Sequence, residues 1–449
     1  MGYPWECPLC PACPVRSMRG KLNEFQKNVL RWNRVHPYNA VHAVRIPRPL
    51  DQPRLIETIN GELESLGLTG LVIDRRRYTF EYGGGPARNE LKTIDGGNNL
   101  LSVLSREFEL QLNTAFQDDG AINPFRFFAI REDDGFSLGL TYFHVIAGAE
   151  AIILLMKRLI GRYTGEDLPG FSAPLDLYPK GDPIILRLYP TLLFRKLASY
   201  ASTVPAMRQA SKPRYQDFRN PAIGVRVFSL SAKQFETLRG AAKRWGVTVN
   251  DLFLALLMNT LSPFAAKRFS ATRRRNLSVG SIVNTRRDLG FDPFKTFGLF
   301  LGSFVVSHPV PEEMTVENLA REIHNYTDKV KRARAYLGTP VDLWLGRVLA
   351  SVSSASQEKS FYAKANPLWG GVTNMNVNTL WEQREGGCPI DYFRAVSTGP
   401  ITPLVLAPTT VGDVVNIGLS YRKTVFSENQ MGEFVPHFEE TIKQIEVVS

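Results

Sequence analysis

The clearest pattern of apolar and polar positions in the chain lies between residues 123 and 165. Alternating apolar residues predict two strands at 123–130 and 136–143, joined by an Asp-Asp-Gly turn. Helical spacing follows at 148–163, and Gly165 stands where the glycine that ends a helix is expected. His144 lies at the junction of the second strand and this helix. Such a position can aim an imidazole into a cleft, so His144 is a candidate for acyl-transfer chemistry, although a packed core histidine fits the same pattern.

Strands and helices alternate along the rest of the chain as well. Ser231 with Gln234, and Thr248 with Asp251, are capping-box signals that begin two helices on either side of Gly246. The alternation predicts an α/β fold with mixed strand pairing, in a sandwich layout. The remaining periodic segments are helices at 22–32, 53–66, 98–116, 315–336 and 428–445, strands at 40–46, 277–283 and 302–308, and a strand-rich region at 372–421.

The chain divides into four parts. Its 449 residues are many for one hydrophobic core and typical of two. We expect a Cys- and Pro-rich tail at 1–17, an N-terminal lobe at 18–170 that carries His144, a Pro-rich connection between lobes at 171–222, and a C-terminal lobe at 223–449. Within the connection, residues 184–200 combine apolar, basic and aromatic side chains at helical spacing. This segment fits either peripheral contact with an anionic membrane or a helix packed on one lobe.

The tail contains a Cys-x2-Cys-x2-Cys pattern at Cys7, Cys10 and Cys13. That spacing is half of an iron–sulfur or zinc site. The only other cysteine, Cys388, is far away in the sequence, so neither a metal site nor a disulfide framework is favoured. Met18 is an alternative start of the protein, in which case residues 1–17 do not belong to it.

A series of short motifs follows His144 in the sequence and continues towards the C-terminus. Residues 246–255 open a helix with Gly-x-Thr-x-Asn-Asp, 278–287 read as a strand that ends in Asn-x-Arg, and 371–374 read as a strand that ends in Thr-Asn. Together with residues 142–149, these segments resemble, in order and spacing, the condensation-domain superfamily. That superfamily includes chloramphenicol acetyltransferase, the HxxxD acyltransferases and the wax ester synthase/diacylglycerol acyltransferase family.

The resemblance implies a fold and a catalytic base. His144 matches the second histidine of the HHxxxDG motif, which the superfamily uses as general base. The motif is degenerate, because Phe143 replaces the first histidine, Gly148 the aspartate and Ala149 the glycine. The implied fold is a two-lobed chloramphenicol acetyltransferase-like α/β sandwich with a tunnel between the lobes.

Two further positions are implied to be structural. Asn284 and Arg286 match the Asn-x-Arg strand, whose arginine pairs with the motif aspartate in the superfamily. Gly148 offers no carboxylate here. Glu150 is two residues further on, about 200° around a helix with 3.6 residues per turn, so we do not expect it to reach Arg286.

The implied activity is acyl transfer from an acyl-CoA or carrier-protein thioester to a hydroxyl or amine acceptor, with His144 as general base. The thioester is a co-substrate, and neither a metal nor another cofactor is expected. The alternative is a catalytically inactive module that binds a carrier protein or recruits a partner enzyme. The substrate-binding positions implied by the resemblance are Phe143, Gly148, Thr373 and Asn374.

Charge and hydropathy indicate which classes of partner the protein can bind. The net charge is +11, and much of it lies in basic runs at 75–77, 267–268, 273–275 and 329–334. A basic surface attracts polyanions, and an anionic CoA or carrier protein fits better than nucleic acid, because no nucleic-acid-binding motif accompanies the runs. No apolar run is long enough to span a bilayer, and no signal peptide is evident. We therefore expect a cytoplasmic monomer.

Overall fold

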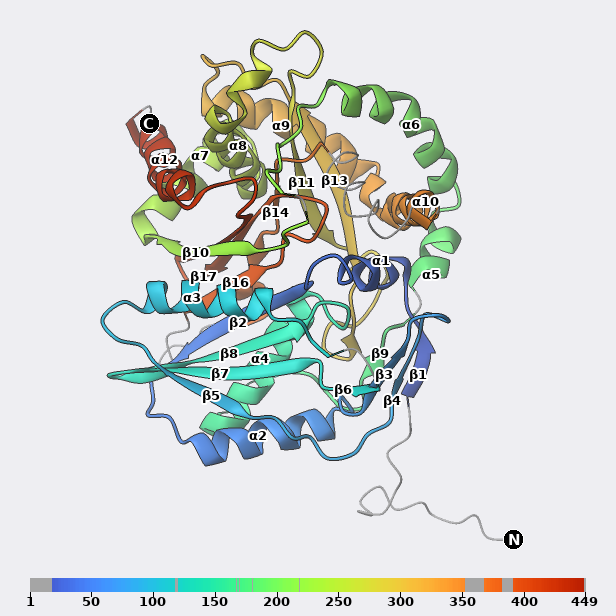
Figure 1. Cartoon of the computed structure of the whole chain (residues 1–449), viewed down its shortest axis with the longest axis vertical. Coiled ribbons are helices and arrows are strands. Elements are labelled where there is room, and N and C mark those ends of the chain that lie inside the picture. The colour runs from blue at the N-terminus through green and yellow to red at the C-terminus, as the bar shows by residue number, and fades with distance from the viewer. Residues whose placement is uncertain are drawn as a thin grey trace.

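The computed structural model describes residues 18–447 apart from 118–119, 167, 169, 180, 218, 352–366 and 382–390. Two lobes lie one above the other along the longest axis, each built on a sheet with helices against it (Figure 1). The predicted two-lobed α/β sandwich is confirmed. The three cysteines of the tail pattern and Cys388 lie outside the described residues.

The N-terminal lobe is built on a five-stranded sheet in the order β16-β2-β8-β7-β5. The predicted hairpin is present, with Glu132 paired to Gly135 across a two-residue turn. β5 lies parallel to β7, whereas β16 and β8 flank β2 in antiparallel orientation. The strands are β2 (Asn39–Ile46), β5 (Leu91–Asp95), β7 (Phe125–Glu132), β8 (Gly135–Phe143) and β16 (Tyr392–Val396).

Four helices and a smaller sheet complete this lobe. α4 ends as predicted, because Gly165 adopts a left-handed conformation at φ 75° that other residues rarely take. The helices are α1 (Glu24–Trp32), α2 (Gln52–Ser65), α3 (Leu100–Asn113) and α4 (Ala149–Thr164). The smaller sheet, in the order β1-β4-β3-β6, contains β1 (Met18–Lys21), β3 (Leu71–Asp74), β4 (Thr79–Tyr82) and β6 (Ala121–Ile122).

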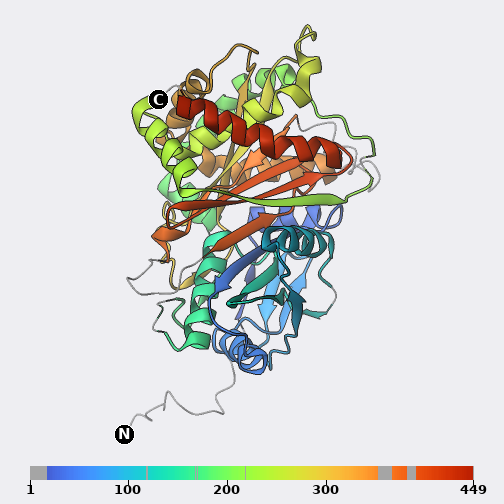
Figure 2. The same ribbon diagram turned by 90° about the vertical axis from the view of Figure 1, so that its left-hand side faces the viewer.

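The C-terminal lobe is built on a seven-stranded sheet in the order β10-β18-β17-β14-β11-β13, with β15 paired to β17. Figure 2 shows the last helix, α12 (Glu428–Val447), lying across one face of this sheet. The strands are β10 (Ile223–Leu230), β11 (Leu277–Asn284), β13 (Leu301–His308), β14 (Gly370–Val372), β15 (Met375–Asn376), β17 (Leu404–Val411) and β18 (Val414–Arg422). The other elements among the described residues are α7 (Ala232–Trp245), α8 (Val249–Leu261), α9 (Val316–Arg332), α10 (Thr339–Ser351) and the 3₁₀ turns η1 (Pro263–Arg268), η2 (Ala335–Gly338) and η3 (Val377–Thr379). The short strand β12 (Thr296–Phe297) pairs with β9 (Asp176–Leu177) of the connection.

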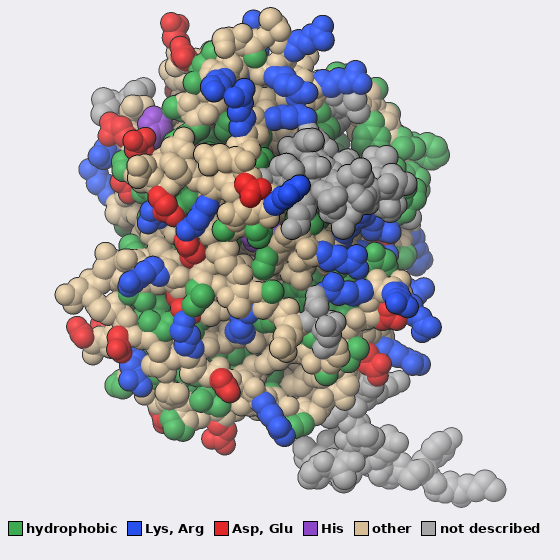
Figure 3. All heavy atoms as spheres, viewed as in Figure 1, with side chains coloured by type: hydrophobic (Ala, Val, Ile, Leu, Met, Phe, Trp, Pro, Cys, Tyr) green, Lys and Arg blue, Asp and Glu red, His purple; other side chains and the backbone are tan. Residues whose placement is uncertain are grey.

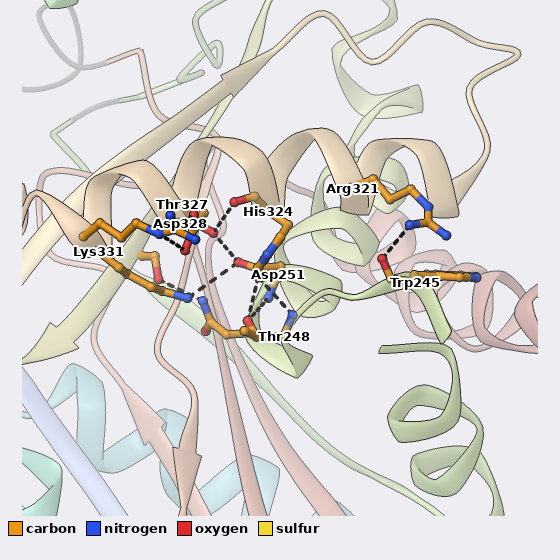
Figure 4. Close-up of polar contacts among 11 residues, drawn as sticks. Trp245, Thr248, Asp251, Arg321, His324, Thr327, Asp328 and Lys331 are labelled. Atoms are coloured by element: carbon orange, nitrogen blue, oxygen red, sulfur yellow. Dashed lines mark hydrogen bonds and ion pairs between the residues drawn. The ribbon is translucent and has the colours of Figure 1, made fainter. Parts of the chain in front are cut away.

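A buried carboxylate joins α8 to α9. Thr248 and Asp251 form the predicted capping box at the start of α8. Asp251 is completely buried, and it also accepts hydrogen bonds from His324 Nδ1 at 2.8 Å and Thr327 Oγ1 at 2.7 Å (Figure 4). Burial alone would raise the pKa of Asp251, but these hydrogen bonds hold it below its ordinary value. The motif that resembles the superfamily therefore positions two helices relative to each other.

The two lobes are joined by more than the connecting segment. β16 comes from the predicted C-terminal lobe but pairs with β2 in the N-terminal sheet. α3 packs against β10 through a cluster of buried apolar side chains that includes Phe108 and Val225. The predicted lobe boundaries at residues 170 and 222 stay a prediction. β16 follows residue 222 in the sequence, yet it belongs to the sheet of the N-terminal lobe.

The connection forms α5 (Gly181–Leu188) and α6 (Leu192–Gln209). α6 packs on the C-terminal lobe through Lys196 and Tyr200, which both contact Asp342 of α10, at 2.6 and 2.7 Å. Leu192 is buried, whereas Leu193, Phe194 and Leu197 face solvent, and Phe194 is 74% exposed. No helix in the described part of the chain combines the length and hydropathy needed to cross a bilayer.

Candidate active site

His144 is held at the point where β8 ends. The pairing of β2 with β8 brings Tyr38 beside it, and the His144 backbone N–H donates to the Tyr38 carbonyl at 3.1 Å. The ring Nδ1 lies 2.9 Å from the carbonyl oxygen of Ala147. Because a carbonyl can only accept, the neutral ring carries its proton on Nδ1 and its lone pair on Nε2. The side chain lines the cavity described below, so Nε2 is the ring nitrogen available to a substrate.

Aromatic rings enclose the imidazole. Tyr38 stacks on it with ring centres 5.6 Å apart, and Tyr142 meets it edge to face at the same distance. Burial lowers the pKa of His144 to about 4, and the nearby charge of Arg394 acts in the same direction. The ring is therefore neutral at pH 7.

One face of the N-terminal sheet carries polar groups into the cavity. His42 on β2 pairs with Arg394 on β16, and Tyr142 on β8 pairs with Ala40, so the three side chains share a face. His42 Nδ1 lies 2.6 Å from the Tyr392 hydroxyl. Burial, followed by the charge of Arg394, keeps the pKa of His42 well below its ordinary value.

Phe143 faces the other way. Successive residues of a strand alternate between faces, and Tyr142 takes the face that borders the cavity. Phe143 is completely buried and stacks on Phe116 with ring centres 6.0 Å apart. The structure therefore does not bring Phe143 to the cavity where the resemblance implied a substrate contact.

Arg394 is a buried cation in the cavity wall. Arg394 is only 3% exposed to solvent. Nη2 donates to the carbonyls of Thr373 and Pro408, and Nη1 and Nε reach the hydroxyls of Thr373 and Thr409 at 3.3 and 3.4 Å. All of these partners are neutral oxygens. Burial lowers the pKa of Arg394 to about 10, so the guanidinium stays charged at pH 7.

Across the cavity, Glu150 supplies the carboxylate that Gly148 lacks. Arg286 Nη1 lies 3.7 Å from Glu150 Oε2, and Asn284 Nδ2 donates to the same oxygen. The expectation that Glu150 could not reach Arg286 is therefore wrong. Gly148 is the N-cap of α4 with an extended backbone (φ −89°, ψ 168°), so a helical angle cannot be counted from it.

Thr373 and Asn374 follow β14 and line the cavity, as do Gly148, Asn284 and Arg286. The Thr373 carbonyl holds Arg394 in place. Asn374 Oδ1 is buried without a hydrogen-bond partner among the described residues. A buried polar atom of this kind is available to a bound molecule.

His144, Arg394, Arg286 and Asn374 line one cavity between the lobes. It contains about 1410 Å³ of space, its open mouth included, and is bordered by strands of both sheets. The cavity lies where the tunnel was predicted.

Sequence reasoning missed Arg394, His42, Tyr38 and Tyr142. Two features of the sequence could have pointed to these residues. One is an arginine inside the apolar strand 392–396, and the other is the alternation along β2, which places residues 38, 40 and 42 on one face. Neither signal identifies the partner strand, because β2 and β16 are about 350 residues apart. The cavity face of the sheet is therefore visible only in the folded chain.

Comparison with solved structures identifies the fold. The chain is similar to the first condensation domain of the CDA synthetase, with 15% identity, a TM-score of 0.67, and coverage of 95% of this chain and 96% of that one. It is also similar to the epimerization domain from the third module of tyrocidine synthetase B, at 13% identity and a TM-score of 0.66, with 96% of each chain covered. The X-domain from teicoplanin biosynthesis gives 16% identity and a TM-score of 0.63 over 98% of this chain and 96% of that one.

No known family profile matches the sequence, and no curated protein matches it either. The structural similarity nevertheless covers nearly the whole chain. It agrees with the ordered series of sequence motifs between residues 142 and 374. The chain therefore has the two-lobed fold of condensation and epimerization domains, as the sequence resemblance predicted.

Proposed function

We propose that the chain is an acyltransferase that moves an acyl group from a CoA or carrier-protein thioester to a hydroxyl or amine acceptor. The observation that carries this proposal is the geometry of His144. Its Nδ1 is fixed by Ala147, which leaves a basic Nε2 on the wall of the inter-lobe cavity. The shared fold is consistent with the proposal but does not by itself assign a reaction.

In the proposed reaction, His144 moves one proton. Nε2 takes the proton of the acceptor O–H or N–H while the acceptor atom attacks the thioester carbon. The new C–O or C–N bond forms, the C–S bond breaks, and the imidazolium returns the proton to the departing sulfur. A positioned base of this kind contributes roughly 10²- to 10⁴-fold in rate. A ring whose pKa is about 4 is a weak base but a strong acid towards the thiolate.

Arg394 is suited to stabilise the charge that develops during attack. Its guanidinium is buried and is held by neutral oxygens alone among its hydrogen-bond partners. The thioester oxygen gains negative charge as the acceptor adds, and a fixed cation buried in the cavity wall favours that state. The same negative charge favours protonation of His144, because it offsets the electrostatic effect of Arg394.

Asn374 is the second group with a proposed substrate contact. Its amide lies in the cavity wall next to Thr373, which holds Arg394. Either end of the amide can serve a reactant: the N–H₂ donates to the thioester carbonyl, and the oxygen accepts from the acceptor group. Gly148 and Thr373 border the same space, and we assign them to substrate binding as well.

The test is thiol release from a panel of acyl-CoAs and acyl-loaded carrier proteins, with and without alcohol and amine acceptors. We expect release that depends on an acceptor, and an ester or amide product detected by mass spectrometry. His144→Asn is the sharpest variant, because its amide N–H₂ can still donate to the Ala147 carbonyl while the basic lone pair is lost. It should reduce release at least 100-fold.

The control is His36→Gln. His36 is also a buried histidine, but it contacts Ser397 and Pro37 and does not line the cavity. It should retain acyl transfer per folded molecule. Wild-type turnover in His144→Asn would remove the base from the mechanism. No release by the wild type across the panel would favour the inactive carrier-binding module instead.

A further inference from the structure

A second cavity lies on the C-terminal lobe, away from the inter-lobe site. It is formed by η1 and the loop after it, by the chain that follows α6, and by the segment between β18 and α12. It contains about 1000 Å³ of space, its open mouth included. In Figures 1 and 2, the yellow loop that follows η1 stands at the end of the molecule farthest from the N-terminal lobe. The cavity and the proposed reaction centre are therefore separate.

The rim of this cavity is cationic. Lys212, Arg214, Lys267 and Arg274 line it, and no described residue of the lining carries a negative charge. Lys267 and Arg274 belong to two of the basic runs, whereas Lys212 and Arg214 lie about 60 residues earlier in the sequence. The fold therefore brings together positive charges that are distant in the sequence. Figure 3 shows Lys and Arg side chains gathered around the top of the C-terminal lobe. Partial burial lowers the pKa of Lys212, and the charge of Arg274 lowers it further, so two rim cations lie close together.

The floor of the cavity is aromatic. Trp369 and Phe426 are buried, with ring centres 6.5 Å apart, and Phe264 packs on Phe426 at 5.9 Å. The Trp369 Nε1–H is already satisfied by Ser211 Oγ at 2.9 Å, so this part of the floor offers an apolar ring face. A buried guanidinium, Arg268, adds positive charge at the wall while donating to the carbonyls of Ser262 and Val310 at 2.7 and 2.8 Å.

We infer that this cavity binds a phosphate ester with an apolar or aromatic body. The body would lie on the floor formed by Trp369 and Phe426, and the phosphate would meet the rim at Lys212 and Arg274. An apolar floor alone would accept any hydrophobic group, and a basic rim alone would attract any anion. The combination selects a molecule that carries both parts. The inference is independent of the acyl-transfer proposal.

Isothermal titration calorimetry with the full chain tests this site. The probes are hexyl phosphate, adenosine 3′,5′-bisphosphate, inorganic phosphate and hexanol. We expect hexyl phosphate or the nucleotide to bind at least tenfold more tightly than inorganic phosphate or hexanol, and binding to weaken as salt rises. Preference for hexyl phosphate would indicate a lipid-like ligand, and preference for the bisphosphate a nucleotide. Equal binding of inorganic phosphate, or no binding of any probe, would overturn the inference.

The matched variants are Arg274→Gln and Arg275→Gln. Each arginine is exposed and donates to one backbone carbonyl, that of Ala210 for Arg274 at 3.0 Å and that of Ala271 for Arg275 at 2.8 Å. Only Arg274 lines the cavity. Arg274→Gln should weaken binding of the preferred phosphate ester about tenfold, because a charge-assisted hydrogen bond is lost. Arg275→Gln should change it less than twofold, and equal losses would attribute binding to net charge and overturn the site.

Discussion

His144 combines two properties that a solvent-exposed histidine does not have. Its tautomer is fixed by Ala147, and its pKa is lowered to about 4 by burial and by the charge of Arg394. The protonated form is inactive as a base, so activity is lost only as the pH falls towards 4. The low pKa of His144 therefore predicts that the rate of acyl transfer is constant near neutral pH and falls only in acid.

We expect kcat/KM for acyl transfer to change by less than twofold between pH 8 and pH 5.5. A histidine with the ordinary pKa of about 6.5 would be roughly nine-tenths protonated at pH 5.5 and would lose about tenfold. Initial rates with a saturating acceptor, corrected for folded protein by circular dichroism, measure the profile. A tenfold fall centred near pH 6.5 would contradict the assigned environment of the base.

The ion pair between Glu150 and Arg286 is the second prediction at this scale. Both side chains are largely buried, at 12% and 3% exposure, and they join α4 to the strand that ends at Asn284. Removing Glu150 leaves the buried charge of Arg286 without its carboxylate, so Glu150→Ala should cost roughly 3 kcal/mol of unfolding free energy. A double-mutant cycle with Arg286→Ala should give a coupling energy of about 1–3 kcal/mol. Urea unfolding measures both, and additive single effects would show that the pair is not coupled.

The residues of the site differ in how well the sequence reveals them. His144, Asn284, Arg286, Thr373 and Asn374 stand in recognisable motifs, and the structure places all five on the same cavity. Glu150 was missed because the angle was counted from a residue outside the helix. Arg394 was missed because its role depends on pairing with a strand about 350 residues earlier. Local patterns predict local geometry, and they do not specify long-range pairing.

The same limit holds for elements. Helices with strong caps were predicted closely, as α7 and α8 show, because the cap residues and the apolar stripe are adjacent in sequence. The short strands β1, β3 and β4 were missed, since four residues carry too little periodic signal. The predicted helix at 315–336 ends at Arg332, where the chain tightens into η2.

α6 exposes a face with the composition of a membrane-binding helix. Leu193, Phe194 and Leu197 are 38%, 74% and 52% exposed, and Arg195 lies among them. We expect the protein to cosediment with vesicles that contain anionic phospholipid and not with neutral vesicles. Phe194→Glu should reduce the partition coefficient about tenfold and leave the melting temperature unchanged, because this side chain packs on nothing in the protein core.

The control for this prediction is Leu110→Glu. Leu110 is 51% exposed on α3, on a helix of the other lobe, and the substitution changes the charge by the same amount. It should leave vesicle binding intact. Equal losses in the two variants would mean that net charge, rather than the face of α6, determines binding. If the wild-type protein does not bind anionic vesicles, the prediction is wrong and the exposed apolar face of α6 has no lipid-binding function.

At the scale of the whole molecule, the two lobes share structural elements. β16 completes the N-terminal sheet, and it also lies against β17 and β18 of the C-terminal sheet. α3 buries apolar side chains against both β2 and β10. Loss of either lobe would expose these shared surfaces, so we expect the described parts of the chain to unfold together rather than lobe by lobe.

Three buried histidines make this shared stability sensitive to mild acid. Burial lowers the pKa of His36 to about 3 and of His144 to about 4, and it keeps the pKa of His42 well below its ordinary value. In the unfolded chain, each returns to about 6.5. Between these values the unfolded state binds protons that the folded state does not, so stability falls as the pH falls.

Each histidine should therefore contribute a loss of about 1.4 kcal/mol between pH 7.5 and pH 5.5, or roughly 4 kcal/mol for the three together. That is a large share of the roughly 5–15 kcal/mol typical of a folded domain. Urea unfolding at the two pH values measures the loss. His36→Gln should reduce it by about a third, whereas His437→Gln, at an exposed position of α12, should leave it unchanged. A loss that is the same in the wild type and in His36→Gln would show that His36 takes up its proton without unfolding the chain.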